Sequence, residues 1–173
     1  MRRHSSNVRV IFRQGSINSS YLLHLYSLYQ NFVSTPPSIS VETKTGKTRK
    51  SLSFSTVALP CFNELYKSFY LEGKKIVPNN ISEFLTPVSL AYWIKDDGSF
   101  TGNGIKLHTN AFTIEELKVL IENMNFSLKA TINVSNREKA QYTLYISKNQ
   151  MQLVRNLVID HMHEDMMYKL NRN

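Results

Sequence analysis

The chain has 173 residues, of which 42% are hydrophobic, so a packed core in one domain or in two joined halves is expected and a globally disordered chain is excluded. Lys and Arg number 21 against 13 Asp and Glu, giving a net charge of +8 that favours a polyanionic partner such as nucleic acid. A basic surface without such a role is the plainer alternative. The single cysteine excludes an internal disulfide, and no apolar run approaches the roughly 20 residues of a membrane span.

The first half of the chain predicts a strand, a helix, a hairpin, a second helix and a basic loop. The expected ranges are 8–13, 19–32, 38–57, 60–71 and 73–80. Apolar and basic residues alternate in the strand, so its basic side chains share one face. Asn18 is expected to cap the first helix, and the hairpin is expected to turn around Gly46. Cys61 stands among apolar neighbours and is expected in the core.

A short helix beginning at Pro87 is expected to carry two adjacent carboxylates, Asp96 and Asp97, to a tight turn at Gly98. Thr86 is a good N-cap, and Pro87 suits the first turn because its missing N–H would be unpaired there. Gly98 can take the positive φ that often ends a helix. Carboxylates at a helix C-terminus oppose the macrodipole, so we expect them to bind a divalent metal ion. A solvated turn is the alternative.

The second half repeats the order of the first, with expected elements at 105–109, 113–124, 129–147, 149–160 and 166–169. Asn18 matches Thr113 after 95 residues, and Lys75 matches Lys169 after 94. Such a repeat predicts two halves related by a pseudo-two-fold axis, which we place at 1–84 and 85–173. The same offset sets the counterpart of Asp97 at residues 2–3, which are arginines. The first copy of the helix is therefore expected to be missing.

Several strings, in their order and spacing, resemble the LAGLIDADG homing endonucleases, and most of all the mitochondrial large-rRNA intron (omega) type. The string YLLHLYSLYQNF in the first half is also typical of that family. The resemblance covers nearly the whole chain. It rests on KKIVPNN (74–80), LTPVSLAYW (85–93), LAYWIKDDG (90–98), LHTNAFTIEEL (107–117) and MMYKL (166–170).

The resemblance implies an α+β fold, the LAGLIDADG homing-endonuclease fold, in which each half is an αββαββα unit. Two motif helices pack at the centre, and two saddle-shaped antiparallel sheets lie over the major groove of DNA. Because the first motif helix is expected to be absent, the face of Leu90, Ala91 and Ile94 would lack its main partner. The 173-residue chain alone is then expected to be unstable, to aggregate or to pair through that face.

The resemblance also implies the site residues. Asp97 matches the acid that binds a divalent ion, Mg²⁺, over the scissile phosphate, and carboxylate oxygens suit that ion. Lys75 and Lys169 match the basic active-site residues of the two halves. Asp96 is expected to face a neighbour or solvent, and Lys95 replaces a residue that is often apolar or acidic. Candidates for contact with bases or phosphates of nucleic acid are Arg9, Arg13, Lys44, Lys47, Arg49, Lys106, His108, Lys129, Arg137 and Lys139.

A two-motif enzyme needs one acid for each DNA strand, and this chain supplies one. Three explanations stay open: the reading frame starts upstream, a second chain supplies the missing helix, or the gene is decaying or kept for another role. The expected function is an intron-encoded, site-specific and Mg²⁺-dependent DNA endonuclease, truncated or only nicking.

The alternative function is an RNA maturase that assists splicing of a group I intron without hydrolysis, and a non-functional remnant is a third. The resemblance places the protein in the mitochondrion, encoded by the organelle, with a plastid as the alternative. No membrane partner is expected.

Overall fold

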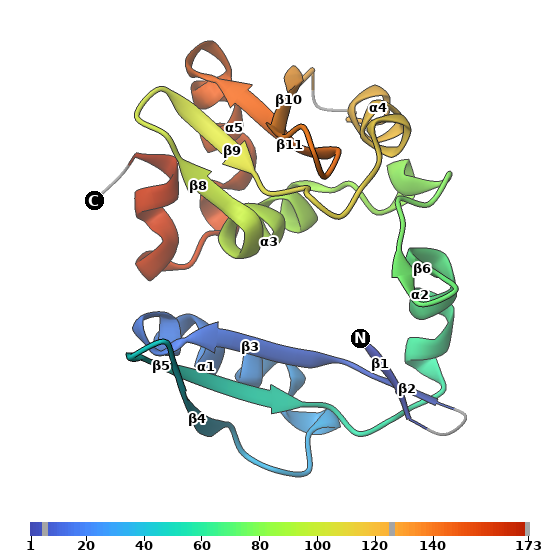
Figure 1. Cartoon of the computed structure of the whole chain (residues 1–173), viewed down its shortest axis with the longest axis vertical. Coiled ribbons are helices and arrows are strands. Elements are labelled where there is room, and N and C mark those ends of the chain that lie inside the picture. The colour runs from blue at the N-terminus through green and yellow to red at the C-terminus, as the bar shows by residue number, and fades with distance from the viewer. Residues whose placement is uncertain (5–6, 125–126, 172–173) are drawn as a thin grey trace. The chain divides into compact units, whose positions relative to one another are not determined.

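The computed structural model describes residues 1–4, 7–124 and 127–171, and it divides the chain into two compact units, Met1–Ser68 and Phe69–Asn173 (Figure 1). We refer to them as unit 1 and unit 2. Each consists of an antiparallel sheet with helices packed on it. This is the α+β arrangement that the sequence predicted. Among the described residues, no helix has the length and apolar character that crossing a lipid bilayer requires.

Unit 1 is built around a three-stranded sheet in the order β3-β5-β4, next to a short hairpin of β1 and β2. Helix α1 lies between β3 and the β4–β5 hairpin in sequence, flanked by 3-10 turns at Ser16–Asn18 and Gln30–Phe32. The elements are β1 (Arg2–His4), β2 (Asn7–Arg9), β3 (Ile11–Gly15), α1 (Ser19–Tyr29), β4 (Ser38–Lys44), β5 (Lys47–Ser55) and α2 (Cys61–Phe69).

The single strand predicted over 8–13 is divided in two at Val10. The backbone oxygen of Val10 accepts from Thr56 N at 3.0 Å, and Val10 N donates to the Thr56 hydroxyl at 3.0 Å, so a side chain replaces one ladder bond there. Asn18 occupies the predicted cap position of α1, but its amide donates to the Gln14 side chain and not to the helix. The prediction for Cys61 was wrong: it is exposed, and Phe62 beside it takes the buried position.

The two faces of the unit 1 sheet differ in character. Phe12 and Phe54 are opposite in register and stack with ring centroids 4.7 Å apart, and Tyr26 and Tyr29 of α1 pack on them. The opposite face carries the neighbouring residues of each strand, among them Arg13 and a row of serines. The helix side is therefore the core, and the other side is free to meet a polar partner.

Unit 2 contains a four-stranded sheet in the order β10-β11-β9-β8 and a tight hairpin of β6 and β7. Four 3-10 segments connect its elements: η3 (Ile81–Glu83), η4 (Lys148–Gln150), η5 (Ile159–His161) and η6 (Glu164–Leu170). The helices and strands are β6 (Tyr70–Leu71), β7 (Lys74–Lys75), α3 (Pro87–Asp97), β8 (Gly98–Phe100), β9 (Gly104–Leu107), α4 (Ile114–Glu122), β10 (Ala130–Asn136), β11 (Gln141–Ser147) and α5 (Met151–Val158).

One hydrophobic core holds unit 2 together. Ile105 and Leu107 of β9 and Leu144 and Ile146 of β11 are fully buried on the same side of the sheet. Apolar residues of α3, α4 and α5 pack against them, which places all three helices on that face. The opposite face of the sheet carries no helix of unit 2 among the described residues.

The two sheets share one connection order, which confirms the repeat read from the sequence. In unit 1 a strand, β3, leads through α1 to a hairpin whose second strand, β5, pairs with it. In unit 2, β9 leads through α4 to a hairpin whose second strand, β11, pairs with it.

Candidate active site

Helix α3 begins where the sequence predicted, at a capping box formed by Thr86 and Ser89. Ser89 N donates to the Thr86 hydroxyl at 3.1 Å, and Thr86 N donates to the Ser89 hydroxyl at 2.8 Å. This reciprocal pairing satisfies two backbone donors at the start of the helix. Leu90 and Ile94 lie on the buried face of the helix, while the last turn leaves Asp96 and Asp97 exposed. The start and the buried face of α3 are therefore held in place, and its two carboxylates are exposed to solvent.

Gly98 ends α3 for a reason that the sequence did not predict. Its backbone has φ −87° and ψ 148°, so it is extended and opens strand β8 directly. The glycine is required by space: a Cβ at this position would lie 2.5 Å from the backbone oxygen of Ile94. The close approach lets Gly98 N donate to that same oxygen.

The carbonyl end of α3 is satisfied by groups from two distant segments. The ammonium of Lys169 donates to Ile94 O at 3.2 Å and to Lys95 O at 2.5 Å. His108 N, just after β9, donates to Asp97 O at 2.9 Å. The last carbonyls of a helix have no partner within it, and a cation there suits the dipole. The unfavourable position of the two carboxylates is thus offset by a buried positive charge.

Lys95 is itself buried, with 2% of its surface exposed. Its ammonium donates to His161 O of η5 at 2.7 Å and lies 3.4 Å from the centroid of the Tyr92 ring. Burial lowers the pKa of Lys95 to about 8, and the charge of Asp96 opposes that decrease.

Lys169 lies in η6 with 6% of its surface exposed. Burial lowers its pKa, and the charges of Asp96 and Asp97 act in the opposite direction. The sequence predicted Lys169 as a basic residue of the active site. The structure places Lys169 at the same end of α3 as Asp97, where its ammonium donates to backbone carbonyls of the helix.

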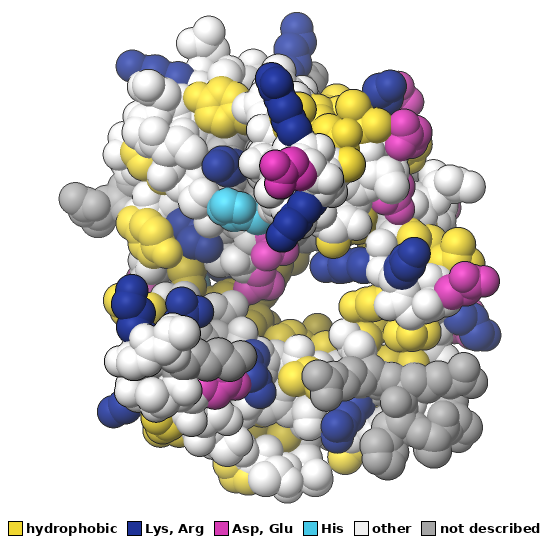
Figure 2. All heavy atoms as spheres, viewed as in Figure 1, with side chains coloured by type: hydrophobic (Ala, Val, Ile, Leu, Met, Phe, Trp, Pro, Cys, Tyr) yellow, Lys and Arg dark blue, Asp and Glu magenta, His cyan; other side chains and the backbone are white. Residues whose placement is uncertain are grey.

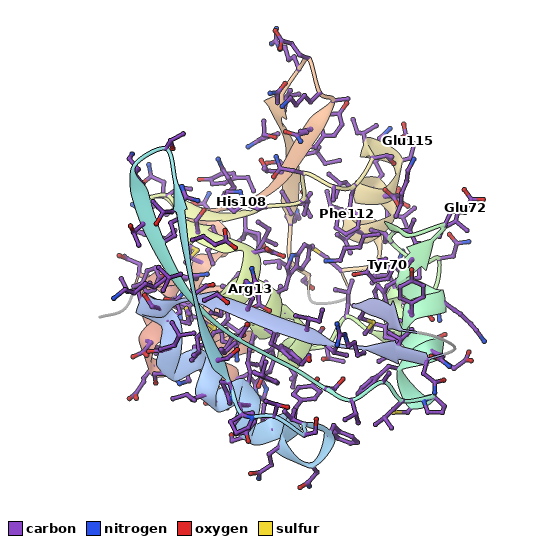
Figure 3. The ribbon with its side chains drawn as sticks, turned by 60° about the horizontal axis from the view of Figure 1, so that its bottom comes forward. Arg13, Tyr70, Glu72, His108, Phe112 and Glu115 are labelled. Carbon is purple, nitrogen blue, oxygen red and sulfur yellow. The ribbon has the colours of Figure 1, made fainter. Side chains whose placement is uncertain are left out.

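Lys75 and Asp97 line one cavity of about 200 Å³ within unit 2. The rest of the wall is mainly apolar, with Trp93 and Phe112 among its members. Lys75 is exposed on β7, and its ammonium lies 5.9 Å from the centroid of the Phe112 ring. Figure 3 labels Phe112 in the loop before α4, and Tyr70, which pairs with Lys75 in the β6–β7 hairpin.

Glu116 fixes the loop that follows Lys75. One of its carboxylate oxygens accepts from Thr113 N at 2.7 Å, completing the capping box of α4, and the other accepts from Val77 N at 3.2 Å. The sequence predicted an element that begins at residue 113, but the contact with Val77 joins segments 39 residues apart. The role of Phe112 in the cavity was missed for the same reason.

The outer sheet face of unit 1 carries most of the basic residues predicted there. Arg13, Lys47 and Arg49 share this face by register, and Arg13 forms an ion pair with Glu42 at 3.6 Å. The backbone of Lys44 ends β4, but its side chain lies outside the described residues.

Arg9 differs from the other basic residues of unit 1, because it is half-buried. With Arg13 it lines a largely polar cavity of about 880 Å³. Its buried Nε has no hydrogen-bond partner in the part of the chain that the structure describes. Arg9 therefore has unused donor capacity next to the exposed face.

In unit 2, Lys106 and His108 project from the outer sheet face, because their neighbours Ile105 and Leu107 are buried. The His108 ring lies 3.2 Å from the Ser99 hydroxyl, and Figure 3 labels it beside β9. Three further predicted basic residues are exposed at the start of β10 and at the tip of the β10–β11 hairpin: Lys129, Arg137 and Lys139. Figure 2 shows Lys and Arg side chains spread over the visible surface of each unit, with fewer acids.

Carboxylate oxygens at the end of α3 suit a hard divalent ion such as Mg²⁺, Ca²⁺ or Mn²⁺. Among residues 1–4, 7–124 and 127–171, no group of three or more His, Cys, Asp or Glu side chains could enclose an ion. Mg²⁺ does not require such a cage, since it keeps several waters and binds through one or two carboxylates together with substrate phosphates. An exposed carboxylate such as that of Asp97 suits that mode.

A family model described as the LAGLIDADG DNA endonuclease family matches residues 1–154. The chain belongs to the LAGLIDADG DNA endonuclease family. A solved structure of the homing endonuclease I-WcaI bound to its DNA recognition sequence has a TM-score of 0.88 and 27% identity to it, covering 99% of this chain and 80% of that one. The LAGLIDADG fold predicted from the sequence is thereby confirmed.

Similar proteins within the family carry two kinds of name. The cytochrome b mRNA maturase bI2 of Debaryomyces hansenii is 34% identical over 98% of this chain, and the intron-encoded endonuclease ai4 of Dictyostelium discoideum is 40% identical over 68% of it and 75% of the relative. The chain spans 66% of the length of the D. hansenii maturase and 43% of its Saccharomyces cerevisiae counterpart.

Proposed function

We propose that this chain is an intron-encoded, site-specific DNA endonuclease in which Asp97 holds a Mg²⁺ ion at the scissile phosphate. The observation that carries the proposal is that Asp97 and Lys75 line one cavity at the exposed end of α3. A carboxylate for a divalent ion and a mobile cation for the phosphate are the two groups that phosphodiester hydrolysis needs side by side. The family membership gives the reaction class.

Each group has a separate task in the proposed reaction. A divalent ion held by Asp97 would withdraw charge from the scissile phosphate. The ammonium of Lys75, exposed at the cavity rim, stabilises the charge that develops on the phosphate oxygens. The rest of the cavity wall, around Trp93 and Phe112, is mainly apolar and leaves Lys75 and Asp97 as its charged groups.

The outer sheet faces supply the DNA contacts in this proposal. Lys106 and His108 in unit 2 and Arg13, Lys47 and Arg49 in unit 1 are placed to meet phosphates or base edges of duplex DNA. Antiparallel strands fit the width of the major groove, and long basic side chains reach both its edges and its floor.

Replacement of Asp97 by Asn tests the proposal. On a plasmid carrying the ligated exon junction of the host gene, Asp97→Asn should abolish Mg²⁺-dependent cleavage and leave DNA affinity within about twofold, since the amide is a poor metal ligand. Asp96→Asn is the matched control and should retain cleavage. If Asp97→Asn cuts as well as the parent chain, Asp97 is not the metal ligand.

RNA maturase activity is the second candidate, and the names of the bI2 relatives favour it. A maturase would use the same basic faces on its group I intron without hydrolysis and would have no need of the Asp97 carboxylate. Tight binding to the intron RNA, assisted splicing and no cleavage of DNA would select this candidate. Splicing that survives Asp97→Asn would separate the two activities.

We also propose a mitochondrial location, because intron-encoded relatives of this kind include cytochrome b mRNA maturases of yeasts. A second chain that supplies another acidic motif helix remains part of the proposal. It predicts that the chain alone nicks one strand and that the two chains together cut both. Separation of nicked and linear plasmid on a gel decides between these outcomes.

A further inference from the structure

We propose that Lys95 and Lys169 are a pair of positioning residues that lock the carbonyl end of α3 and thereby set the place of the Asp97 carboxylate. The inference rests on the proposed metal role of Asp97. It assigns a role to Lys95, which the proposed reaction does not use. It also gives Lys169, which the resemblance makes a basic active-site residue, the role of positioning the metal ligand.

The position of Lys95 supports such a role. Its ammonium is buried, donates to His161 O at 2.7 Å and lies against the Tyr92 ring. A buried ammonium costs free energy unless it is bonded, so the contact with η5 is strongly specified. Because Lys95 belongs to the last turn of α3, its side chain ties that turn to η5, 66 residues further along the chain.

Lys169 acts on the same turn from another segment. Its ammonium spans two consecutive carbonyls, Ile94 O at 3.2 Å and Lys95 O at 2.5 Å, from a position that is 6% exposed. A cation in this position caps the helix and opposes the dipole, which otherwise adds to the negative charge of Asp96 and Asp97. Two of the three ammonium donors of Lys169 are directed at backbone carbonyls, so the side chain is tied to the helix end.

The two lysines join α3, η5 and η6 around one helical turn. Asp97 is two residues beyond Lys95, and its own carbonyl is held by His108 N at 2.9 Å. The backbone that carries the Asp97 carboxylate is thus held on both sides. Groups that orient a metal ligand in this way usually contribute about 10- to 100-fold to metal affinity or activity.

The direction of the change in metal affinity separates positioning from simple electrostatics. Loss of a cation beside Asp96 and Asp97 should by itself strengthen metal binding, because it removes repulsion of the ion. Loss of a positioning contact should weaken it. The two roles therefore predict opposite signs for the same substitution.

The experiment compares Lys95→Met and Lys169→Met with Lys148→Met, which removes an exposed lysine from η4. Binding of Mn²⁺ alone to the DNA-free full chain is followed by electron paramagnetic resonance, and thermal melting checks that each variant folds. Binding of duplex DNA in Ca²⁺ is measured in parallel. We expect Mn²⁺ affinity to fall about 10-fold or more in both variants, to be unchanged in the control, and DNA affinity to stay within about twofold of the parent chain.

Unchanged or stronger Mn²⁺ binding in folded Lys95→Met and Lys169→Met would overturn the inference. A loss of DNA affinity in Lys169→Met as large as its loss of Mn²⁺ affinity would also overturn it, because it would indicate that Lys169 contacts the DNA directly. If Lys169→Met does not fold, Lys169→Arg retains donors at the helix end and should restore most of the Mn²⁺ affinity; failure to do so also overturns it. Asp97→Asn is included as a reference. If it binds Mn²⁺ as the parent chain does, the proposed metal role fails and not the positioning role alone.

Discussion

At the residue scale, the end of α3 shows how few atoms determine the candidate site. The sequence alone makes Asp97 a candidate metal ligand, because acids at a helix C-terminus are unfavourable and indicate another task. It identified Gly98 but for the wrong reason, and it did not predict that Lys95 is buried. The need for glycine at position 98 and the burial of Lys95 both depend on which atoms lie beside the helix end. These atoms are the backbone oxygens of Ile94 and His161, and since every residue type has a backbone oxygen, the sequence does not point to them.

Substitution of Gly98 by Ala should be costly because the added methyl group would meet the backbone of Ile94 at 2.5 Å. We expect a loss of about 1–3 kcal/mol in the free energy of unfolding, as for other overpacked sites, together with weaker cleavage through displacement of Asp97. Urea unfolding measures the first effect and plasmid cleavage the second. Gly15→Ala is the control, since its Cβ would meet nothing within 4 Å, and a similar loss there would contradict the steric explanation.

The lowered pKa of Lys95 predicts a pH dependence of stability. Its folded-state pKa is about 8 and its ordinary value is 10.5, so between these values the unfolded chain binds a proton that the folded chain has released. The free energy of unfolding therefore rises with pH across that window. In the metal-free protein, the difference in unfolding free energy between the parent chain and Lys95→Met should shift in favour of the parent from pH 8 to pH 10. A constant difference would show that Lys95 remains charged throughout.

At the element scale, the starts of helices were easier to predict than their ends. Thr86 and Thr113 form their capping boxes within four residues of sequence, so a local pattern contains the whole motif. The end of α3 needs Lys169 and His108, and the strand predicted over 8–13 is interrupted by Thr56. These are tertiary contacts between distant segments, so the local periodicity of the sequence does not predict them.

The capping box of α4 also fixes the loop after Lys75, and two substitutions separate these roles. Thr113→Ala removes only the cap, which should cost about 1 kcal/mol of stability and leave cleavage unchanged. Glu116→Ala also removes the bond to Val77 N, so cleavage should fall as Lys75 loses its fixed place in the cavity. Equal cleavage by the two variants at matched stability would show that the Val77 contact does not position Lys75.

At the scale of the whole molecule, the structure shows where the basic residues that give the net charge of +8 are located. Arg13, Lys47 and Arg49 lie on the outer sheet face of unit 1 and Lys106 on that of unit 2, because the period of two in a strand fixes the side to which each residue points. The sequence could not show which of them are free. Arg13 is engaged with Glu42, and Arg9 is half-buried beside the cavity of unit 1.

If the sheet faces bind nucleic acid through phosphates, the affinity should fall steeply with salt. Replacement of Lys106 by Gln should reduce the slope of log affinity against log salt concentration by about one. Lys118→Gln, on the exposed side of α4, should leave the slope unchanged. Fluorescence anisotropy with a labelled duplex from 50 to 300 mM salt would measure both, and equal slopes would place Lys106 outside the DNA interface.

The exposed thiol of Cys61 makes the unmodified chain suitable for single-site labelling. It is the sole cysteine among 173 residues, and it stands at the first position of α2, away from Asp97 and Lys75 in the sequence. A maleimide dye or spin label should therefore attach with a stoichiometry of one without any engineered cysteine. A dye-labelled duplex would then serve as the acceptor in an energy-transfer measurement that follows engagement of DNA by unit 1.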